Sequence, residues 1–174
     1  MRILFLIFIV FLLFSCSAEN KSENKLEINK NGYSISYPDQ LSTDESIDGL
    51  EFIIFTEKSN PDDDFIENIN LIIQDLDSLN IDLHDYARIS EQQIVENNGE
   101  IISYDLKKNY DQDFYRFMYN MPMNDNHLSF LQHFYLSNSK VYILTFSSEM
   151  TEFDNYVKEM EEIMLSFQLR EIIL

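Results

Sequence analysis

The fold is decided by HFYLSNSKVYILTFSSEMTEFDNYVKEMEEIMLSFQL, residues 133–169, which combine two strands and one helix in a single run. The stretch VYILTF, residues 141–146, is apolar on both faces, which predicts a central strand covered on both sides. The polar residues 137–140 predict the turn that joins it to the strand before. After Met150 apolar side chains return at helical spacing, and Thr151 with Asp154 matches a capping box. The run therefore predicts strand, turn, central strand and a final amphipathic helix.

Upstream of this run, strand and turn signals alternate around one further helix. That helix is predicted from Asp82, a suitable N-cap, to Gly99, a suitable C′ glycine. Strands are predicted over residues 26–38 (a hairpin around Asn31 and Gly32), 49–57, 65–73, 100–107, 114–121 and 128–136. This order indicates the α+β class. We expect an antiparallel β-sheet with helices packed on both faces, an α/β/α sandwich.

The N-terminus carries the pattern of an export signal. Arg2 is followed by an apolar run over residues 3–14, shorter than the roughly 20 residues that a membrane-spanning helix needs. Residues 13–16, LFSC, resemble a bacterial lipobox, although Phe14 is bulky where a small residue is usual. The motif implies cleavage before Cys16 and acylation of that cysteine. The alternative is an ordinary signal peptide with an incidental cysteine.

These features divide the chain into three parts. We expect residues 1–15 to be a lipoprotein signal peptide, residues 16–25 to be the lipidated cysteine with a flexible tether, and residues 26–174 to form a single domain. Two or more acyl chains hold a protein firmly on a bilayer. A lipidated Cys16 therefore predicts a membrane-anchored lipoprotein of the bacterial cell envelope that faces the periplasm.

The composition excludes several classes of site. Cys16 is the only cysteine, so the chain forms neither an internal disulfide nor a thiolate metal site. A net charge of -19 argues against nucleic-acid binding. The histidines at 84, 127 and 133 lack the spacing of a helical zinc site, and the loop from Asp75 lacks the Gly and Glu of an EF-hand. The three aspartates at 62–64 are interpreted as a solvated loop. We therefore expect no metal and no cofactor.

Aromatic side chains are the candidate binding residues. Because the sequence contains no G-x-S-x-G, Walker or dinucleotide-binding loop, an enzyme is not expected, and a hydrolase is a weak alternative. Tyr115, Phe117 and Tyr119 share one face of a predicted strand, and Tyr135 lies on the next strand. These rings could line a groove for a partner or an apolar ligand. The competing interpretation is that they pack in the core.

Three segments resemble the PsbP/Mog-like family, which includes bacterial DcrB-like lipoproteins. They are NGYSISYPDQL at 31–41, HDYARISEQQI at 84–94 and the run at 133–169, within a resemblance that covers residues 28–169. Leu41 departs from the pattern, since many relatives carry a tryptophan there. The resemblance implies an α/β/α sandwich and no catalytic signature, and it implies binding or assembly of other proteins.

These observations lead to one main functional hypothesis and two alternatives. We expect a lipid-anchored, non-enzymatic module that reaches the membrane through Cys16 and binds or helps assemble another envelope protein. The first alternative is a protein that binds a small apolar ligand in a pocket between sheet and helix. The second is a hydrolase.

Overall fold

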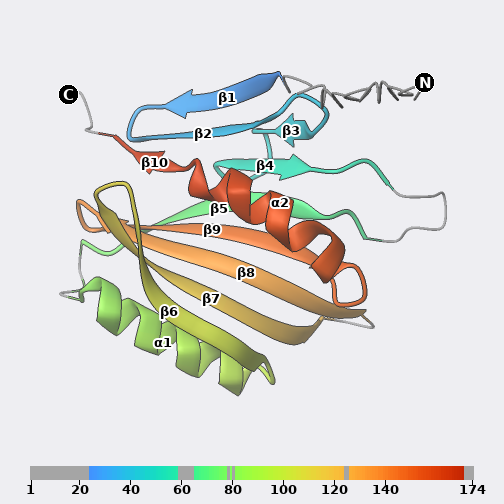
Figure 1. Ribbon diagram of the computed structural model, residues 1–174. Helices are drawn as coiled ribbons and strands as arrows, with labels where there is room; N and C mark the ends of the chain where they lie inside the picture. Colours follow the sequence, from blue (N-terminus) through green and yellow to red (C-terminus); the bar gives the residue numbers. More distant parts are fainter. Residues whose placement is uncertain (1–23, 59–64, 78, 80, 124–125, 171–174) are drawn as a thin grey trace, which may run out of the picture.

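The computed structural model describes residues 24–58, 65–77, 79, 81–123 and 126–170. In this part of the chain two antiparallel sheets and two helices form one body (Figure 1). The elements are β1 (Lys25–Lys30), β2 (Tyr33–Pro38), β3 (Ser42–Asp44), β4 (Phe52–Phe55), β5 (Asn68–Asp75), α1 (Leu83–Glu96), β6 (Glu100–Asn109), β7 (Gln112–Met123), β8 (Asn126–Ser137), β9 (Lys140–Glu149), α2 (Phe153–Leu165) and β10 (Gln168–Leu169).

The larger sheet has seven strands in the order β3-β4-β5-β9-β8-β7-β6. Strand β9 contains VYILTF and lies between β5 and β8, so the prediction of a central strand is confirmed. Leu144 and Phe146 of β9 are fully buried. The predicted turn before β9 is confirmed as well. Its residues Asn138 and Ser139 have φ values of 50° and 57°, the positive values that a tight hairpin between twisted strands requires.

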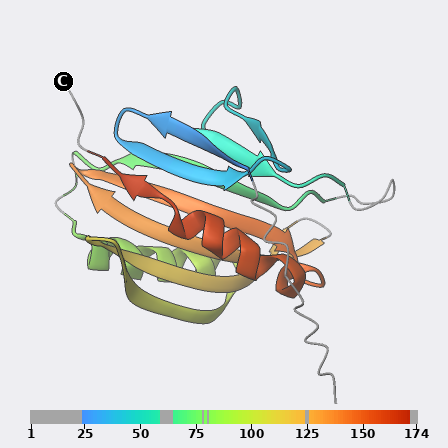
Figure 2. The ribbon, with the colours of Figure 1, turned by 45° about the horizontal axis from the view of Figure 1, so that its top comes forward.

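The two helices cover opposite faces of this sheet. On one face α1 packs against β6, β7 and β8, where Ala87 and Ile94 join the rings of Phe117 and Phe134. On the other face α2 packs against β8 and β9, and Met164 is fully buried there. The predicted α+β class, with helices on both faces of an antiparallel sheet, is therefore confirmed (Figures 1 and 2).

The predicted hairpin at 26–38 is confirmed, and it forms a sheet of its own. Strand β2 pairs with β1 on one side and with the short β10 on the other. This small sheet lies next to α2 (Figure 2), and its Tyr33 packs on the rings of Phe52, Tyr142 and Phe167. The α2 face of the large sheet is therefore covered jointly by a helix and a small sheet. Strand β1 begins at Lys25, the last residue of the predicted tether.

The helix ends correct two details of the sequence analysis. Asp82 caps α1 as predicted, because its carboxylate accepts a hydrogen bond from the Asp85 N–H at 2.8 Å. Gly99 is not the C′ residue. Asn98 takes the left-handed conformation (φ 62°), and Gly99 follows it because a Cβ there would lie 2.5 Å from Cγ2 of Ile94. The predicted capping box at Thr151 is wrong, since α2 begins at Phe153 with Glu152 at its N-cap position, and no side chain caps it.

Candidate functional site

A groove of about 430 Å³ lies between α1 and the sheet face that this helix covers. Helix α1 crosses β6, β7 and β8, so the neighbouring surface of β9 and β5 forms the uncovered floor. The lining comes from α1, from the loop after it, and from four strands. The lining residues are Ile72, Gln74, Tyr86, Ser90, Gln93, Ile94, Asn97, Tyr119, Met121, Gln132, Phe134, Ile143 and Thr145.

No charged side chain is among these described lining residues, although the chain holds 31 acidic residues and a net charge of -19. Apolar side chains such as Ile72 and Phe134 alternate with neutral amides and hydroxyls such as Gln132. Three other hollows in the described part of the chain each include charged residues, among them Glu159 and Lys140. The groove beside α1 therefore offers a neutral surface, both apolar and hydrogen-bonding, within an acidic protein.

Hydrogen bonds between its own side chains hold the groove in shape. The Tyr86 hydroxyl donates to Oε1 of Gln74 at 2.8 Å, which ties α1 to β5. Nε2 of Gln132 donates to Oγ1 of Thr145 at 3.0 Å across the floor. The ring of Tyr86 meets Phe134 edge to face, with 5.4 Å between centroids. Burial raises the pKa of Tyr86 and of Tyr119, so both phenols stay neutral at physiological pH.

The structure brings three of the four predicted binding residues together and separates the fourth. Tyr115, Phe117 and Tyr119 all face α1, and of these only Tyr119 lines the groove. The Tyr115 hydroxyl is hydrogen-bonded to Nδ1 of His84 at 2.7 Å. Tyr135 lies on the opposite face, where its ring packs against Phe114 and Phe167. Because Tyr135 lies on the opposite face of the sheet, a single surface cannot include the whole set.

Sequence reasoning missed the polar floor of the groove. Gln132 lies between Phe130 and Phe134 on the apolar face of β8, and this interruption is the signal that could have indicated an incompletely covered surface. Thr145 is the cross-strand partner of Gln132, and it interrupts β9 in the same way. Gln132 and Thr145 are paired across adjacent strands beside apolar side chains, in the part of the face that lines the groove.

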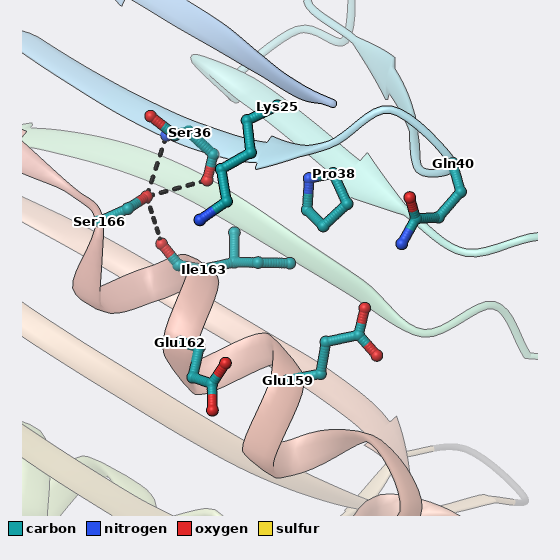
Figure 3. A pocket seen from close by; sticks show the side chains of 8 residues that line it. All are labelled: Lys25, Ser36, Pro38, Gln40, Glu159, Glu162, Ile163 and Ser166. Carbon is teal, nitrogen blue, oxygen red and sulfur yellow. Dashed lines mark hydrogen bonds between the residues drawn. The ribbon is translucent and has the colours of Figure 1, made fainter. Parts of the chain in front are cut away.

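A second hollow, of about 320 Å³, lies between the small sheet and α2 (Figure 3). It contains charges of both signs, from Lys25 on one side and Glu159 and Glu162 on the other. The Ser166 hydroxyl is engaged there, since it donates to backbone carbonyl oxygens and accepts from the Ser36 N–H at 2.9 Å. A serine held by backbone groups joins the end of α2 to β2, and no histidine is among the described lining residues.

One histidine does lie close to a carboxylate, but this pair is enclosed. His133 on β8 is fully buried, and its Nε2 is 3.9 Å from Oε1 of Glu161 on α2. Arg116 on β7 forms two hydrogen bonds to the same carboxylate, at 2.6 and 3.0 Å. Burial lowers the pKa of His133 despite the nearby carboxylate. His133 and the hydrogen bonds from Arg116 hold the pKa of Glu161 at about 2. Because His133 has no exposed surface, we interpret this cluster as a connection between the sheet and α2.

The described part of the chain holds neither a cluster of metal ligands nor a membrane-spanning helix. No group of three or more His, Cys, Asp or Glu side chains in that part is arranged to hold a metal ion. Within the same residues, neither helix combines the length and apolar character needed to cross a bilayer. Cys16 and the three aspartates at 62–64 lie outside the described residues.

Comparison with known proteins places the chain among proteins of one fold. A family model described as PsbP matches residues 24–169, which is most of the chain. No curated protein matches the sequence. Cyanobacterial PsbP from Synechocystis sp. PCC 6803 has a solved structure with a TM-score of 0.62 and 17% identity, covering 91% of this chain and 99% of that chain.

Two further solved structures share the fold. The Ran-binding protein Mog1p of Saccharomyces cerevisiae gives a TM-score of 0.58 at 10% identity, with 86% of this chain and 97% of that chain covered. LpqN, involved in cell envelope biogenesis of Mycobacterium tuberculosis, gives a TM-score of 0.60 at 11% identity. The match covers 85% of this chain and 91% of that chain. At these identities the likeness shows the fold alone. It confirms the predicted PsbP/Mog-like architecture.

Proposed function

This chain belongs to the PsbP family, and we propose that it is a non-enzymatic binding or assembly protein of the bacterial cell envelope, lipid-anchored through Cys16. In this proposal the groove beside α1 receives a segment of another envelope protein. The observation that carries the proposal is the absence of charge from the described lining of that groove, in a chain of net charge -19.

The chemistry of the groove fits a protein segment. Gln93 and Asn97 on the α1 side present amide groups able to bond a peptide backbone, and Ile72 and Met121 offer apolar contact. Protein interfaces typically have a core poor in charge and a more polar rim. The net charge of -19 of the whole chain favours a partner with basic residues at the edge of its contact.

The relatives with solved structures support two parts of the proposal, protein binding and a place in the cell envelope. Mog1p is described as binding Ran, another protein, and LpqN is described as involved in cell envelope biogenesis. Together they support a protein-binding role in the envelope. Because a fold does not carry a particular partner, neither partner is transferred to this chain.

A charge placed in the groove tests this proposal. Ile72→Glu is expected to lower the yield of crosslinked partner about tenfold or more, since an unpaired charge in a contact costs at least about 1.4 kcal/mol. The measurement is chemical crosslinking in intact bacterial cells with a tagged full-length chain. Ile47→Glu is the matched control, because Ile47 is 42% exposed and Ile72 is 38% exposed. Equal yields from the two variants would contradict a role of the groove.

A small apolar ligand is the second candidate for the same groove. Its volume of about 430 Å³ falls within the range typical of ligand sites. Tyr119, Met121 and Ile143 supply apolar surface next to the few polar groups that would orient a ligand. Native mass spectrometry of the purified protein distinguishes the candidates. If the purified protein carries a small molecule and the Ile72→Glu variant does not, the result favours the small-ligand candidate over the protein partner.

The proposed anchor gives a separate prediction. A Cys16→Ser variant is expected to lose all fatty-acyl label and to leave the membrane fraction, because residues 3–14 are too short to span a bilayer. Metabolic labelling with a palmitate analogue, followed by fractionation, measures both effects. Ser17→Ala is the control and is expected to keep label and location. If the Cys16→Ser variant keeps its acyl label, Cys16 is not the lipid anchor.

A further inference from the structure

Strand β6 is the edge strand of the seven-stranded sheet (Figure 1), and its exposed side chains are both apolar and charged. In the described part of the chain it pairs with β7 on one side only. Ile102, Tyr104 and Leu106 of β6 are 53%, 47% and 57% exposed, and Tyr110 just after the strand is 66% exposed. A long edge strand with exposed apolar side chains can pair with another strand, which natural proteins usually prevent.

Residues 103–109 of β6 are regular enough to accept such a strand. The bulge in the pairing with β7 lies between Ile101 and Ser103, and from Ser103 to Asn109 the register is continuous. Tyr104 and Leu106 lie on the α1 face, opposite Phe117 and Tyr115. Their exposure shows that α1 leaves the edge uncovered. The outer side of this segment is therefore a regularly paired edge whose side chains are exposed.

The charge of this edge differs from that of the whole chain. Strand β6 contains Glu100, Asp105, Lys107 and Lys108, so its acidic and basic residues are equal in number. The chain as a whole carries a net charge of -19. Two copies of so acidic a protein repel each other over most of their surfaces. Within β6 itself the charges balance, so the strand adds no net repulsion of its own.

We propose that a second copy of this chain pairs edge to edge with β6, antiparallel, about a twofold axis at Leu106. In an antiparallel pair, two residues directly opposite each other both point their backbone groups toward the partner strand or both point them away. Two copies of one strand related by a twofold axis meet this condition only when the axis passes through a residue that faces itself in the second copy. An axis at Asp105 would place two aspartates opposite each other, and an axis at Lys107 would do the same with two lysines. Like charges directly opposite destabilise a sheet.

The remaining choices are distinguished by their side-chain pairs. With an axis at Tyr104, Asp105 would face Ser103 of the second copy and Lys107 would face Ile101. Neither charged side chain would then lie opposite a residue of the other sign. An axis at Leu106 places Asp105 of each copy opposite Lys107 of the other, twice.

The same axis also accounts for the exposed apolar side chains. It pairs the two Leu106 side chains and sets Tyr104 opposite the stem of Lys108. The two exposed apolar residues within the regular segment thereby gain a neighbour from the second copy. The two seven-stranded sheets would become one continuous sheet.

Cysteine crosslinking tests the axis. A full-length chain with Leu106→Cys is expected to form a covalent dimer in most molecules on mild oxidation, because facing side chains lie about 5 Å apart across paired strands. Leu26→Cys is the matched control, since Leu26 is 45% exposed on the edge strand β1 and is expected to stay monomeric. A Leu106→Cys chain that stays monomeric, or equal dimer from both variants, would overturn the proposal.

A charge exchange tests the register. In the Leu106→Cys chain, Asp105→Lys or Lys107→Asp alone places like charges opposite each other, and each is expected to reduce the dimer at least tenfold. The two substitutions together restore opposite pairs and are expected to restore the dimer. Circular dichroism of each variant checks the fold. If the double variant stays monomeric while folded, the register is wrong.

Discussion

Replacing Arg116 with methionine is expected to lower the free energy of unfolding by about 2–4 kcal/mol. Arg116 makes two hydrogen bonds to the Glu161 carboxylate, and without Arg116 this partly buried carboxylate loses both. Losing one partner of a fully buried pair costs about 3–5 kcal/mol, and partial exposure of both side chains (16% and 26%) reduces this. Urea denaturation followed by circular dichroism measures the change.

The control for this prediction is an exposed ion pair in the same protein. Arg88 and Asp85 on α1 lie 3.7 Å apart, and the Arg88 side chain is 56% exposed. Arg88→Met is therefore expected to change stability by less than about 0.5 kcal/mol. If the two variants lose equal amounts, the cluster under α2 does not have the role described here.

Acid is expected to destabilise the protein in two windows of pH. Burial lowers the pKa of His133, so below about pH 6.5 the unfolded chain binds a proton that the folded chain does not. Stability then falls by up to about 1.4 kcal/mol per pH unit. Glu161 has a pKa of about 2 in the fold and 4.5 ordinarily, so its stabilisation is complete above pH 4.5 and is lost as pH falls toward 2. With partial exposure this second loss is about 2–3 kcal/mol.

Two variants separate these windows from the titration of the other acidic residues. His133→Met is expected to flatten the pH dependence just below 6.5, because it removes the buried imidazole that only the unfolded chain protonates there. Glu161→Gln is expected to remove the lower window. Urea denaturation at several pH values measures both. An unchanged slope between pH 6.5 and 5 in His133→Met would contradict the assignment to His133.

Much of the fold follows from local sequence patterns. The two-sided apolar stretch at 141–146 identifies a central strand, because no exposed strand could carry it. Asp82 identifies the start of α1, since its carboxylate satisfies a free backbone N–H. The joining of β10 to the hairpin could not be predicted, because two residues carry no periodicity.

The candidate site is harder to predict than the fold. The groove exists because α1 covers only part of a face, and that position depends on packing between elements distant in the sequence. The sequence suggests one binding surface for Tyr135 and Tyr115 because both are aromatic and lie on neighbouring strands. The register pairs Tyr135 with Phe114 instead, and a shift of one residue moves a side chain to the opposite face.

The central claim is that the groove beside α1 holds a protein partner in the cell. Its most direct test is a photoreactive amino acid placed at Gln93, which lines the groove, and in parallel at Gln92, its exposed neighbour outside that lining. Irradiation of intact cells is expected to give one discrete adduct with a different protein from position 93 and none from position 92. No adduct from position 93, or equal adducts from both, would contradict the account.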